Sequence, residues 1–391
     1  VVTGIPLFYM ELSFGQFANL GPISAWRVVP MMKGLGYASV MISAFVSIYY
    51  NVIIGWSLYY LFASMQAKLP WTDCSNLWND ASCRNLPLNS TNGSNVPGNS
   101  RWNPFPLECN DTVKSNCTTY QTAAEQYWER EVLGLTTYNG KQLKLEVDDF
   151  GTPMWPITLA LLLAWILCFV CLIKGVKSSG RVVYFTAIFP YVVMIILVIY
   201  GATLQGARAG IEFYLTPDWS KLATAKPWGD AAIQIFYSLG VAFGGLQTMA
   251  SYNKFKNNCY RDALMVSIIN CCTSVFAGFA IFAVIGYMAI RTGVPIADVV
   301  KDGPGFAFVV YPEGIATMPA PQLWSILFFG MLLTLGLDSQ FGMVETVISG
   351  IADEFPALAG KTFKRKCIFV AGMCIGMFFL GLPMMCRQGI Y

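Results

Sequence analysis

The chain has 391 residues, of which 55% are hydrophobic and only 12% charged, with a net charge of +3. A soluble domain carries about twice that share of charged residues, so composition excludes an ordinary globular protein and indicates a membrane protein. The sequence contains no histidine, which removes histidine-based general-base catalysis, Ser-His-Asp triads and the usual zinc sites. The basic residues lie in short clusters between apolar segments, which is not the footprint of a nucleic-acid-binding protein. We therefore expect neither an enzyme nor a nucleic-acid partner, and a surface covered by membrane lipids.

Apolar segments long enough to cross a bilayer follow one another along the chain, since about 20 apolar residues suffice for a spanning helix. A partial first helix is predicted from Val1 to about Trp26. Complete spans are predicted at 37–65, 155–173, 182–200, 263–290, 323–351 and 367–386, and a discontinuous one at 231–255. The loop at 291–320 is too apolar for a linker, so we expect short re-entrant or capping helices there. The prediction is one incomplete all-α transmembrane domain over residues 1–391.

The segment at 231–255 is a long apolar helix that breaks in its middle. Three glycines within six residues, Gly240, Gly244 and Gly245, disfavour continuous helix. Inside a bilayer, unwound backbone is tolerated only where it lines a cavity or is buried in protein. Helix ends and free carbonyls can hold ions and zwitterions without formal charge. The break therefore predicts a binding site near the middle of the membrane.

Charge and glycosylation signals predict which loops face the outside. Basic residues gather in every second loop, as the positive-inside rule requires of cytoplasmic loops. The segment 66–152 lies between two such loops and is predicted to be a glycosylated extracellular loop. Its four acceptor patterns begin at Asn89, Asn92, Asn110 and Asn116.

The same loop holds four of the twelve cysteines, Cys74, Cys83, Cys109 and Cys117. An extracellular loop favours oxidation, and four cysteines allow three pairings. We prefer Cys74–Cys83, because the ring it closes is short and its tryptophan-containing flanks look ordered.

Polar residues inside the spans are costly and are therefore functional candidates. Gln234 and Ser238 lie four residues apart before the break, and Asn270 and Ser274 lie four apart on the next span, so each pair shares a helix face. Amide and hydroxyl groups can donate to an anion or turn oxygen toward a cation. Ordinary interhelical hydrogen bonding explains the two pairs equally well.

Asp338 lies in a long apolar run, where a carboxylate must be neutralised by a proton, a basic partner or a cation. No Lys or Arg lies at similar depth in its own or the neighbouring spans, so we favour a hard cation held by oxygens over a protonated carboxyl. For Glu11 and Glu345 a hydrogen bond to unwound backbone is at least as well supported. Tyr50, near the middle of its span, needs a partner for its hydroxyl, and a substrate carboxylate is one candidate.

Five stretches together resemble the neurotransmitter sodium symporter family, the sodium- and chloride-dependent solute carriers, and are most similar to its glycine and proline branch. They are GIPLFYMELSFGQF at 4–17, YYN at 49–51, KGVKSSG at 174–180, SYNKFKNNCYRD at 251–262 and TLGLDSQF at 334–341. The resemblance implies a multi-pass plasma-membrane protein with a partial leucine-transporter type inverted-repeat fold. It also implies that the chain runs from within the second transmembrane helix to beyond the ninth.

The resemblance further implies specific roles for residues of this chain. The first sodium would bind Ser238 and Asn270, and the second would bind the Leu335 carbonyl, Asp338 and Ser339. Chloride would bind Gln234, Ser238, Asn270 and Ser274, and Ser274 is neutral where chloride-independent relatives place a carboxylate. The substrate pocket would be lined by Val46, Tyr50, Tyr237, Gly240, Phe243, Gly244, Ser339 and Met343. Tyr252 and Asp353 would belong to a cytoplasmic gate, and Cys74–Cys83 matches the family's outer-loop disulfide.

The substrate implied by the resemblance is a small neutral amino acid, glycine or proline-like. Gln340 is typical of the glycine and proline carriers, whereas Gly240 and Phe243 leave more room than glycine carriers usually do, as in proline and monoamine carriers. Met343 replaces the small glycine of monoamine carriers. A monoamine symporter is therefore the alternative. A channel would need a continuous polar lining, and the mid-membrane break and the lone Asp338 favour a closed alternating site instead. An amino-acid sensor with the same fold could keep the pocket yet lose sodium coupling, and measured sodium-dependent uptake would separate the two.

Overall fold

The structure is a computed structural model, and it describes residues 3–80, 83–84, 121–135, 137–138, 141–142, 152–173, 176–292, 296, 305–316, 318–359 and 362–387. The four predicted glycosylation sites, Asn89, Asn92, Asn110 and Asn116, lie outside the described residues, as do Cys109 and Cys117.

The described chain is almost entirely helical. The helices are α1 Gly4–Ala18, α2 Lys33–Ala63, α3 Ala123–Gln126, α4 Trp155–Leu172, α5 Val176–Ala202, α6 Ala207–Leu215, α7 Ala225–Leu239, α8 Gly245–Ser251, α9 Cys259–Thr292, α11 Tyr311–Ala316, α12 Pro321–Glu354, α13 Pro356–Ala359 and α14 Phe363–Gly381. Short 3-10 or π turns lie at Ser24–Val28, Pro30–Met32, Tyr127–Val132, Trp219–Ala223, Phe306–Val310 and Leu382–Met385. Two small two-stranded sheets complete the secondary structure, β1 Cys83–Arg84 paired in parallel with β2 Gln121–Thr122, and β3 Thr137–Tyr138 paired antiparallel with β4 Lys141–Gln142.

Six of these helices are long and apolar enough to cross a membrane. They correspond to the six continuous spans predicted from the sequence. The seventh predicted span is divided between α7 and α8, which have 15 and 7 residues and are each too short to cross alone. The chain is therefore an all-α membrane protein with one discontinuous helix.

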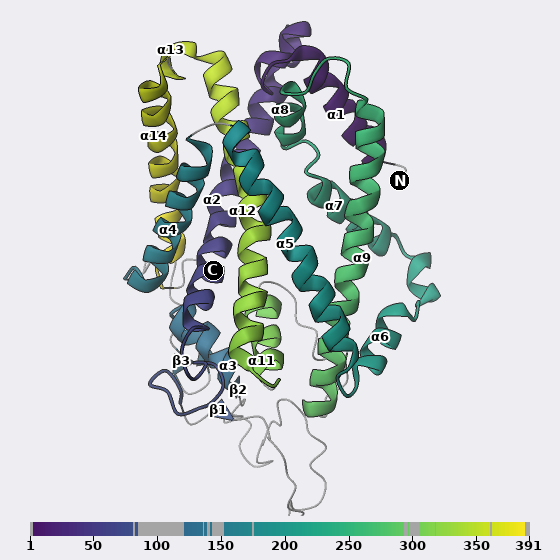
Figure 1. Ribbon diagram of the computed structural model, residues 1–391, viewed down its shortest axis with the longest axis vertical. Coiled ribbons are helices and arrows are strands. Elements are labelled where there is room, and N and C mark those ends of the chain that lie inside the picture. Colours follow the sequence, from purple (N-terminus) through teal and green to yellow (C-terminus); the bar gives the residue numbers. More distant parts are fainter. Residues whose placement is uncertain are drawn as a thin grey trace, which may run out of the picture.

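The long helices form a bundle in which α2 and α12 lie side by side at the centre (Figure 1). α4 and α14 pack on one flank of this pair, and α5 packs against α12 and leads to α9 on the other flank. α1 packs along α8 and α9. The main core follows the α2–α12 contact, and a smaller apolar cluster joins α1 to the break between α7 and α8.

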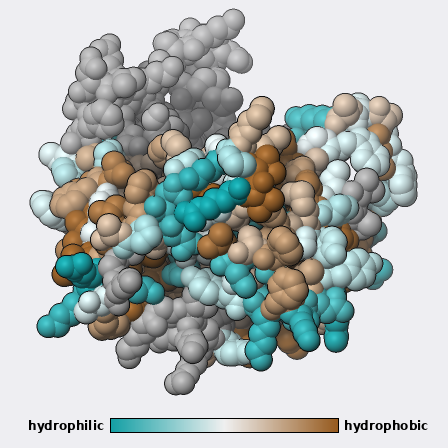
Figure 2. All heavy atoms as spheres, turned by 90° about the horizontal axis from the view of Figure 1, so that it is seen from above, coloured by the Kyte–Doolittle hydropathy of each residue, from teal (hydrophilic) through white to brown (hydrophobic). Residues whose placement is uncertain are grey.

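The loops predicted to lie on opposite sides of the membrane lie at opposite ends of the bundle. α3 and α11 lie at one end, while α13 lies at the other (Figure 1). Seen end-on, the α13 end carries hydrophilic residues interspersed with hydrophobic ones (Figure 2). Lys33 pairs with Glu354 at this end, which ties the start of α2 to the end of α12.

A disulfide joins Cys74 to Cys83, with 5.7 Å between the two Cα atoms, and confirms the preferred pairing. A buried glutamine packs beside it and connects the loop to α3. Gln126 accepts from the Asn79 side chain and the Asp80 backbone, both at 3.2 Å, and donates to the Asp80 carboxylate at 2.8 Å.

The first helix ends earlier than predicted. α1 stops at Ala18, and not near Trp26, because Asn19 adopts a left-handed conformation (φ 48°) and its N–H closes the last turn on Gly15. Gly21 and Pro22 follow, and the chain turns back through 3-10 helix toward α2. The predicted short helices of the 291–320 loop are confirmed as the turn Phe306–Val310 and α11.

Candidate functional site

The break between α7 and α8 is a left-handed excursion of the backbone. Gly240 (φ 68°) caps α7, and Gly244 (φ 76°) precedes α8. Both are positions that glycine occupies without steric cost. Ala242 between them also has positive φ (69°), which costs an alanine roughly 1–2 kcal/mol. The surrounding structure must therefore hold this conformation in place.

Two side chains from other helices satisfy the backbone of the break. Glu11 of α1 accepts a hydrogen bond from the Ala242 N–H at 2.6 Å, and Ser43 of α2 donates to the Phe243 carbonyl at 2.5 Å. The Glu11 contact confirms the predicted carboxylate bond to unwound backbone. Glu345 differs from that prediction, because it accepts from the hydroxyl of Tyr252 at 3.0 Å and of Ser349 at 3.4 Å.

A cavity of about 410 Å³ lies against the break, between α2, α7, α8 and α12. No charged side chain lines it among the described residues. The lining residues are Ser43, Val46, Tyr50, Gln234, Tyr237, Ser238, Leu239, Gly240, Phe243, Gly245, Leu246, Ser339, Gly342 and Met343. Of the eight substrate-pocket residues expected from the sequence, seven are in this lining, and the eighth, Gly244, is the chain neighbour of two lining residues.

The aromatic side of the cavity is built from α2 and the break. The rings of Tyr237 and Phe243 meet edge to face with their centroids 6.0 Å apart. The hydroxyls of Tyr49 and Tyr237 lie 3.4 Å apart, so α2 and α7 also meet through polar groups at this wall. Tyr50 lines the cavity one residue further along α2.

The two polar helix pairs meet across α7 and α9. The Asn270 amide donates to the Ser238 hydroxyl at 2.8 Å, and the Ser274 hydroxyl donates to the Asn270 backbone carbonyl at 3.0 Å. Gln234 and Ser238 also reach the cavity wall. Because the amide nitrogen of Asn270 is engaged by Ser238, its carbonyl oxygen remains as an acceptor, while the Ser238 hydroxyl proton remains as a donor. The set therefore offers an acceptor that could serve a cation and a donor that could serve an anion.

Asp338 finds a partner on α5. The Thr186 hydroxyl donates to one carboxylate oxygen of Asp338. None of the ion pairs among the described residues includes Asp338. The sequence had not singled out Thr186, although a threonine inside the otherwise apolar span 182–200 was the available signal. The half-buried Asp338 carboxylate thus lies beside a hydroxyl oxygen and has no basic partner among the described residues. Such a group of oxygens suits a hard cation.

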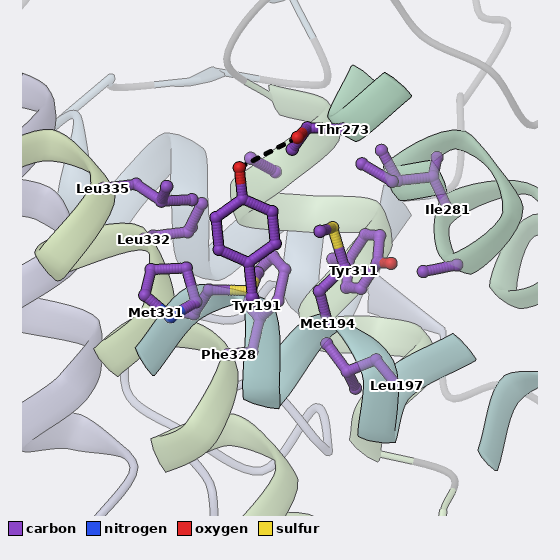
Figure 3. A pocket seen from close by; sticks show the side chains of 14 residues that line it. Tyr191, Met194, Leu197, Thr273, Ile281, Tyr311, Phe328, Met331, Leu332 and Leu335 are labelled. Atoms are coloured by element: carbon purple, nitrogen blue, oxygen red, sulfur yellow. Dashed lines mark hydrogen bonds between the residues drawn. The ribbon is translucent and has the colours of Figure 1, made fainter. Parts of the chain in front are cut away.

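A second cavity, of about 290 Å³, lies between α5, α9, α11 and α12 and is almost wholly apolar (Figure 3). A polar link inside it joins the hydroxyls of Tyr191 and Thr273, 2.9 Å apart. Leu335, expected to offer its carbonyl to sodium, has its side chain on the wall of this cavity. An apolar cavity of this kind has few groups that could hold an ion or a zwitterion.

The two expected gate residues lie near the α13 end but do not bond to each other. The Tyr252 hydroxyl lies 3.0 Å from both the Glu345 carboxylate and the Ser349 hydroxyl. The Asp353 carboxylate accepts from the Gly21 backbone N–H at 2.6 Å. A Cβ at position 21 would lie 2.7 Å from that carboxylate, so the contact requires glycine. α8 and the α1–α2 connection are thus both fastened to the same end of α12.

The profile of the sodium:neurotransmitter symporter family matches residues 1–391, the whole chain. The chain belongs to this family. As a member of the sodium:neurotransmitter symporter family, it is a multi-pass plasma-membrane protein, and the family is one of transporters and not of enzymes.

Curated relatives within the sodium:neurotransmitter symporter family share nearly half of the sequence. The chain is 48% identical over 394 residues to the sodium- and chloride-dependent glycine transporter 1 of Xenopus laevis. It is also 48% identical over 400 residues to the sodium- and chloride-dependent neutral and basic amino acid transporter B(0+) of Mus musculus. Each alignment covers 100% of this chain and 60% of the relative, so the chain spans about 60% of the length of these relatives.

A solved structure shares the fold at low sequence identity. The crystal structure of MhsT in complex with L-phenylalanine aligns with a TM-score of 0.68 and 20% identity, over 100% of this chain and 71% of that chain. The match shows that the symporter chain has a leucine-transporter type fold, in which a broken helix is expected at a mid-membrane site.

Proposed function

We propose that the protein couples the entry of a small neutral amino acid to sodium and chloride by alternating access across the plasma membrane. The cavity against the α7–α8 break carries this proposal, because it combines unwound backbone, hydroxyl and amide groups and aromatic walls with no lining charge among the described residues. A zwitterion needs partners for an ammonium and a carboxylate, which backbone groups, helix ends and hydroxyls supply. The relatives named for glycine and for neutral amino acids support the same substrate class.

Within this proposal the polar groups divide by the charge they suit. Ser238 and Asn270 would offer oxygens to one sodium, and the Leu335 carbonyl, Asp338 and Ser339 to a second. Chloride would bind Gln234, Ser238, Asn270 and Ser274, and the Ser274 hydroxyl would have to turn from the Asn270 carbonyl to donate to it. The Ser238–Asn270 hydrogen bond supports the first and third assignments, since it brings the two residues together and leaves the Asn270 amide oxygen as an acceptor and the Ser238 hydroxyl proton as a donor.

The substrate would lie among Val46, Tyr50, Tyr237, Gly240, Phe243, Gly244, Ser339 and Met343. The sodium ions would bring positive charge to one end of the cavity, where the substrate carboxylate would lie near the Tyr50 hydroxyl. The uncharged lining favours a neutral side chain on the substrate. It also counts against a monoamine, because a lone ammonium gains no carboxylate partner from the lining residues, and neither relative described above is named for a monoamine.

Tyr252 and Asp353 would help close the cytoplasmic end. Tyr252, at the end of α8, is held to the α13 end of α12 through Glu345 and Ser349, and Asp353 of α12 holds the Gly21 backbone of the α1–α2 connection. Opening of that end would require these bonds to break, which fits a gate.

Uptake of labelled amino acids by cells expressing the whole protein tests the proposal. We expect saturable uptake of glycine or proline that is abolished when choline replaces sodium and reduced when gluconate replaces chloride. Competition by unlabelled glycine, proline, leucine, lysine and dopamine then ranks the substrates. Sodium-independent binding without uptake would identify a sensor, and stronger competition by dopamine than by any amino acid would favour the monoamine alternative.

A further inference from the structure

Behind the proposed substrate cavity, polar side chains meet at the junction of α2, α12 and α14. Ser47 and Asn51 of α2 and Gln340 of α12 each have 0% of their surface exposed. The Gln340 amide nitrogen donates to the Ser47 backbone carbonyl at 3.0 Å. The Ser47 hydroxyl donates to the Ala44 carbonyl at 2.9 Å and lies 3.5 Å from the Met377 sulfur of α14, which closes the third side.

Three polar atoms of this junction have no protein partner. Among the described residues, neither the amide nitrogen nor the amide oxygen of Asn51 makes a hydrogen bond, and the amide oxygen of Gln340 makes none. Buried polar groups of native proteins are nearly always paired, with protein or with ordered water. Leaving several such groups unpaired in one apolar junction would be costly.

Helix geometry places both amides at the same turn of α2. In α2 the backbone N–H of Asn51 bonds to the carbonyl of Ser47, four residues earlier, and Gln340 donates to the same carbonyl. Side chains of a helix lean toward its N-terminus, so the amide of Asn51 points back to the turn that Gln340 reaches. One small molecule can therefore contact both.

We propose that an internal water-binding site bridges Asn51 and Gln340 at this junction. Water fits the unpaired groups better than a cation does, because the set contains a donor, the Asn51 amide nitrogen, as well as two acceptors. A cation would satisfy the oxygens and leave that donor unpaired. The site has the polar partners that a buried water requires.

The water site lies directly behind the cavity and links its two long walls. Tyr50 precedes Asn51 and Ser339 precedes Gln340, and both preceding residues line the cavity. Hydrogen bonds through water are nearly as favourable as direct ones, yet they exchange more readily when the groups move. The bridged amides thus act as positioning residues that set the register of α2 against α12.

A high-resolution cryo-electron microscopy map of the purified whole protein tests the site directly. We expect a solvent peak within about 3.2 Å of both the Asn51 amide and the Gln340 amide oxygen. The peak should persist when choline replaces sodium. A direct amide–amide hydrogen bond, a gap without density in a map that shows other internal waters, or a peak that disappears without sodium would overturn the proposal.

A double-mutant cycle tests the bridge by an independent measurement, the melting temperature in detergent. We expect N51L and Q340M each to lower it, and the double variant to lower it by clearly less than the sum, because the first substitution already releases the water. S325A is the matched control, since Ser325 is also fully buried in α12 with an unpaired hydroxyl but lies fifteen residues from Gln340. Its combination with N51L should be additive. If the melting-temperature changes of N51L and Q340M are also additive, the bridge is overturned. If N51L does not fold, the maps of the wild-type protein decide.

Discussion

At the scale of single residues, three polar groups of the proposed ion and substrate sites are paired across helix boundaries. Asp338 accepts from Thr186 of α5, Asn270 donates to Ser238 of α7, and Glu11 holds the Ala242 N–H of the break. Each bond fixes the direction in which an oxygen or a proton points, and that direction determines which ion a group can serve. Small substitutions at the partners should therefore alter ion dependence more than they alter folding.

Replacing Thr186 by valine should weaken sodium coupling. The hydroxyl orients the Asp338 carboxylate, and a hydrogen bond to a charged group contributes about 1.5–3 kcal/mol. We expect T186V to raise the sodium concentration for half-maximal uptake roughly tenfold or more, since about 1.4 kcal/mol corresponds to a factor of ten. T186S keeps the hydroxyl and should behave nearly as wild type. An unchanged sodium dependence in T186V would contradict the second-sodium assignment.

Introducing a carboxylate at Ser274 should reduce the need for chloride. Ser274 lies one turn after Asn270 and is exposed on α9, so a longer acidic side chain has room. A fixed negative charge beside the proposed first sodium would supply what a bound anion supplies. We expect uptake by S274E in gluconate medium to approach its rate in chloride. S274A removes the hydroxyl without adding charge and should instead need more chloride, and full chloride dependence in S274E would count against the site.

The sequence predicted some of these residues and missed others for identifiable reasons. The four-residue spacing of Gln234 with Ser238 and of Asn270 with Ser274 is a local signal, and it predicted that each pair shares a helix face. One member of each pair, Ser238 and Asn270, meets the other in the structure. Thr186 was missed because its role depends on α5 lying beside α12, which no local pattern states. Glu345 was assigned the wrong kind of partner for the same reason, because Tyr252 reaches it from α8.

At the scale of elements, close helix contacts hold the break in position. α1 and α8 approach so closely at Gly15 that a Cβ there would lie 2.3 Å from the Gln247 carbonyl oxygen. The Gln16 amide on the same helix donates to the carbonyls of Phe255 and Asn257 at 3.0 and 2.8 Å. α1 is therefore packed against α8 at Gly15 and hydrogen-bonded to the segment that follows α8.

Substituting alanine for two helical glycines should have opposite effects. G15A would force α1 away from the backbone of α8, so we expect a loss of folded protein or a large fall in melting temperature. Gly372 of α14 has nothing within 4 Å of a Cβ, and G372A should raise stability by about 0.5–1 kcal/mol through helix propensity. Fluorescence-detected thermal unfolding compares them, and a G15A protein as stable as wild type would contradict the packing.

The positions of the long helices follow from composition, whereas their ends follow from contacts. Every uncharged run of about 20 residues became a helix, because a bilayer interior leaves few alternatives. The end of α1 at Ala18 depended on Asn19 adopting left-handed geometry, which its type permits but does not require. The break, in contrast, was predicted from its own residues, because it contains Gly240 and Gly244, which adopt positive φ in the structure.

At the scale of the whole molecule, a disulfide stabilises one end of the bundle in addition to ion pairs and hydrogen bonds, whereas the other end is joined by ionic and hydrogen bonds without a disulfide among the described residues. The Cys74–Cys83 link and the Gln126 bonds stabilise the α3 end, while the Lys33–Glu354 pair and the Asp353–Gly21 bond connect loops to α12 at the α13 end. A cross-link that stays closed and weaker bonds that can break suit a molecule in which the α13 end opens and closes.

Ions should stabilise the folded protein as a whole. A ligand that binds only the native state adds RT ln(1 + [L]/Kd), about 2.7 kcal/mol at a hundredfold excess over Kd. We expect the melting temperature to rise when sodium chloride replaces choline gluconate, and to rise less with either ion alone. D338A should lose the part of the sodium response that the second site supplies, whereas G372A should keep the whole response. Equal melting temperatures in all four salts would argue against bound ions.

The hydrogen bond from Asn270 to Ser238 has a thermodynamic consequence. It joins two residues that are both proposed ligands of the first sodium and of chloride, and it restrains the orientation of both side chains. Binding of either ion would hold these two side chains in place and lower the entropic cost of binding the other, which is positive cooperativity. By reciprocity, the factor by which chloride raises the affinity for sodium must equal the factor by which sodium raises the affinity for chloride. This hydrogen bond of 2.8 Å would thus couple the binding equilibria of the two ions.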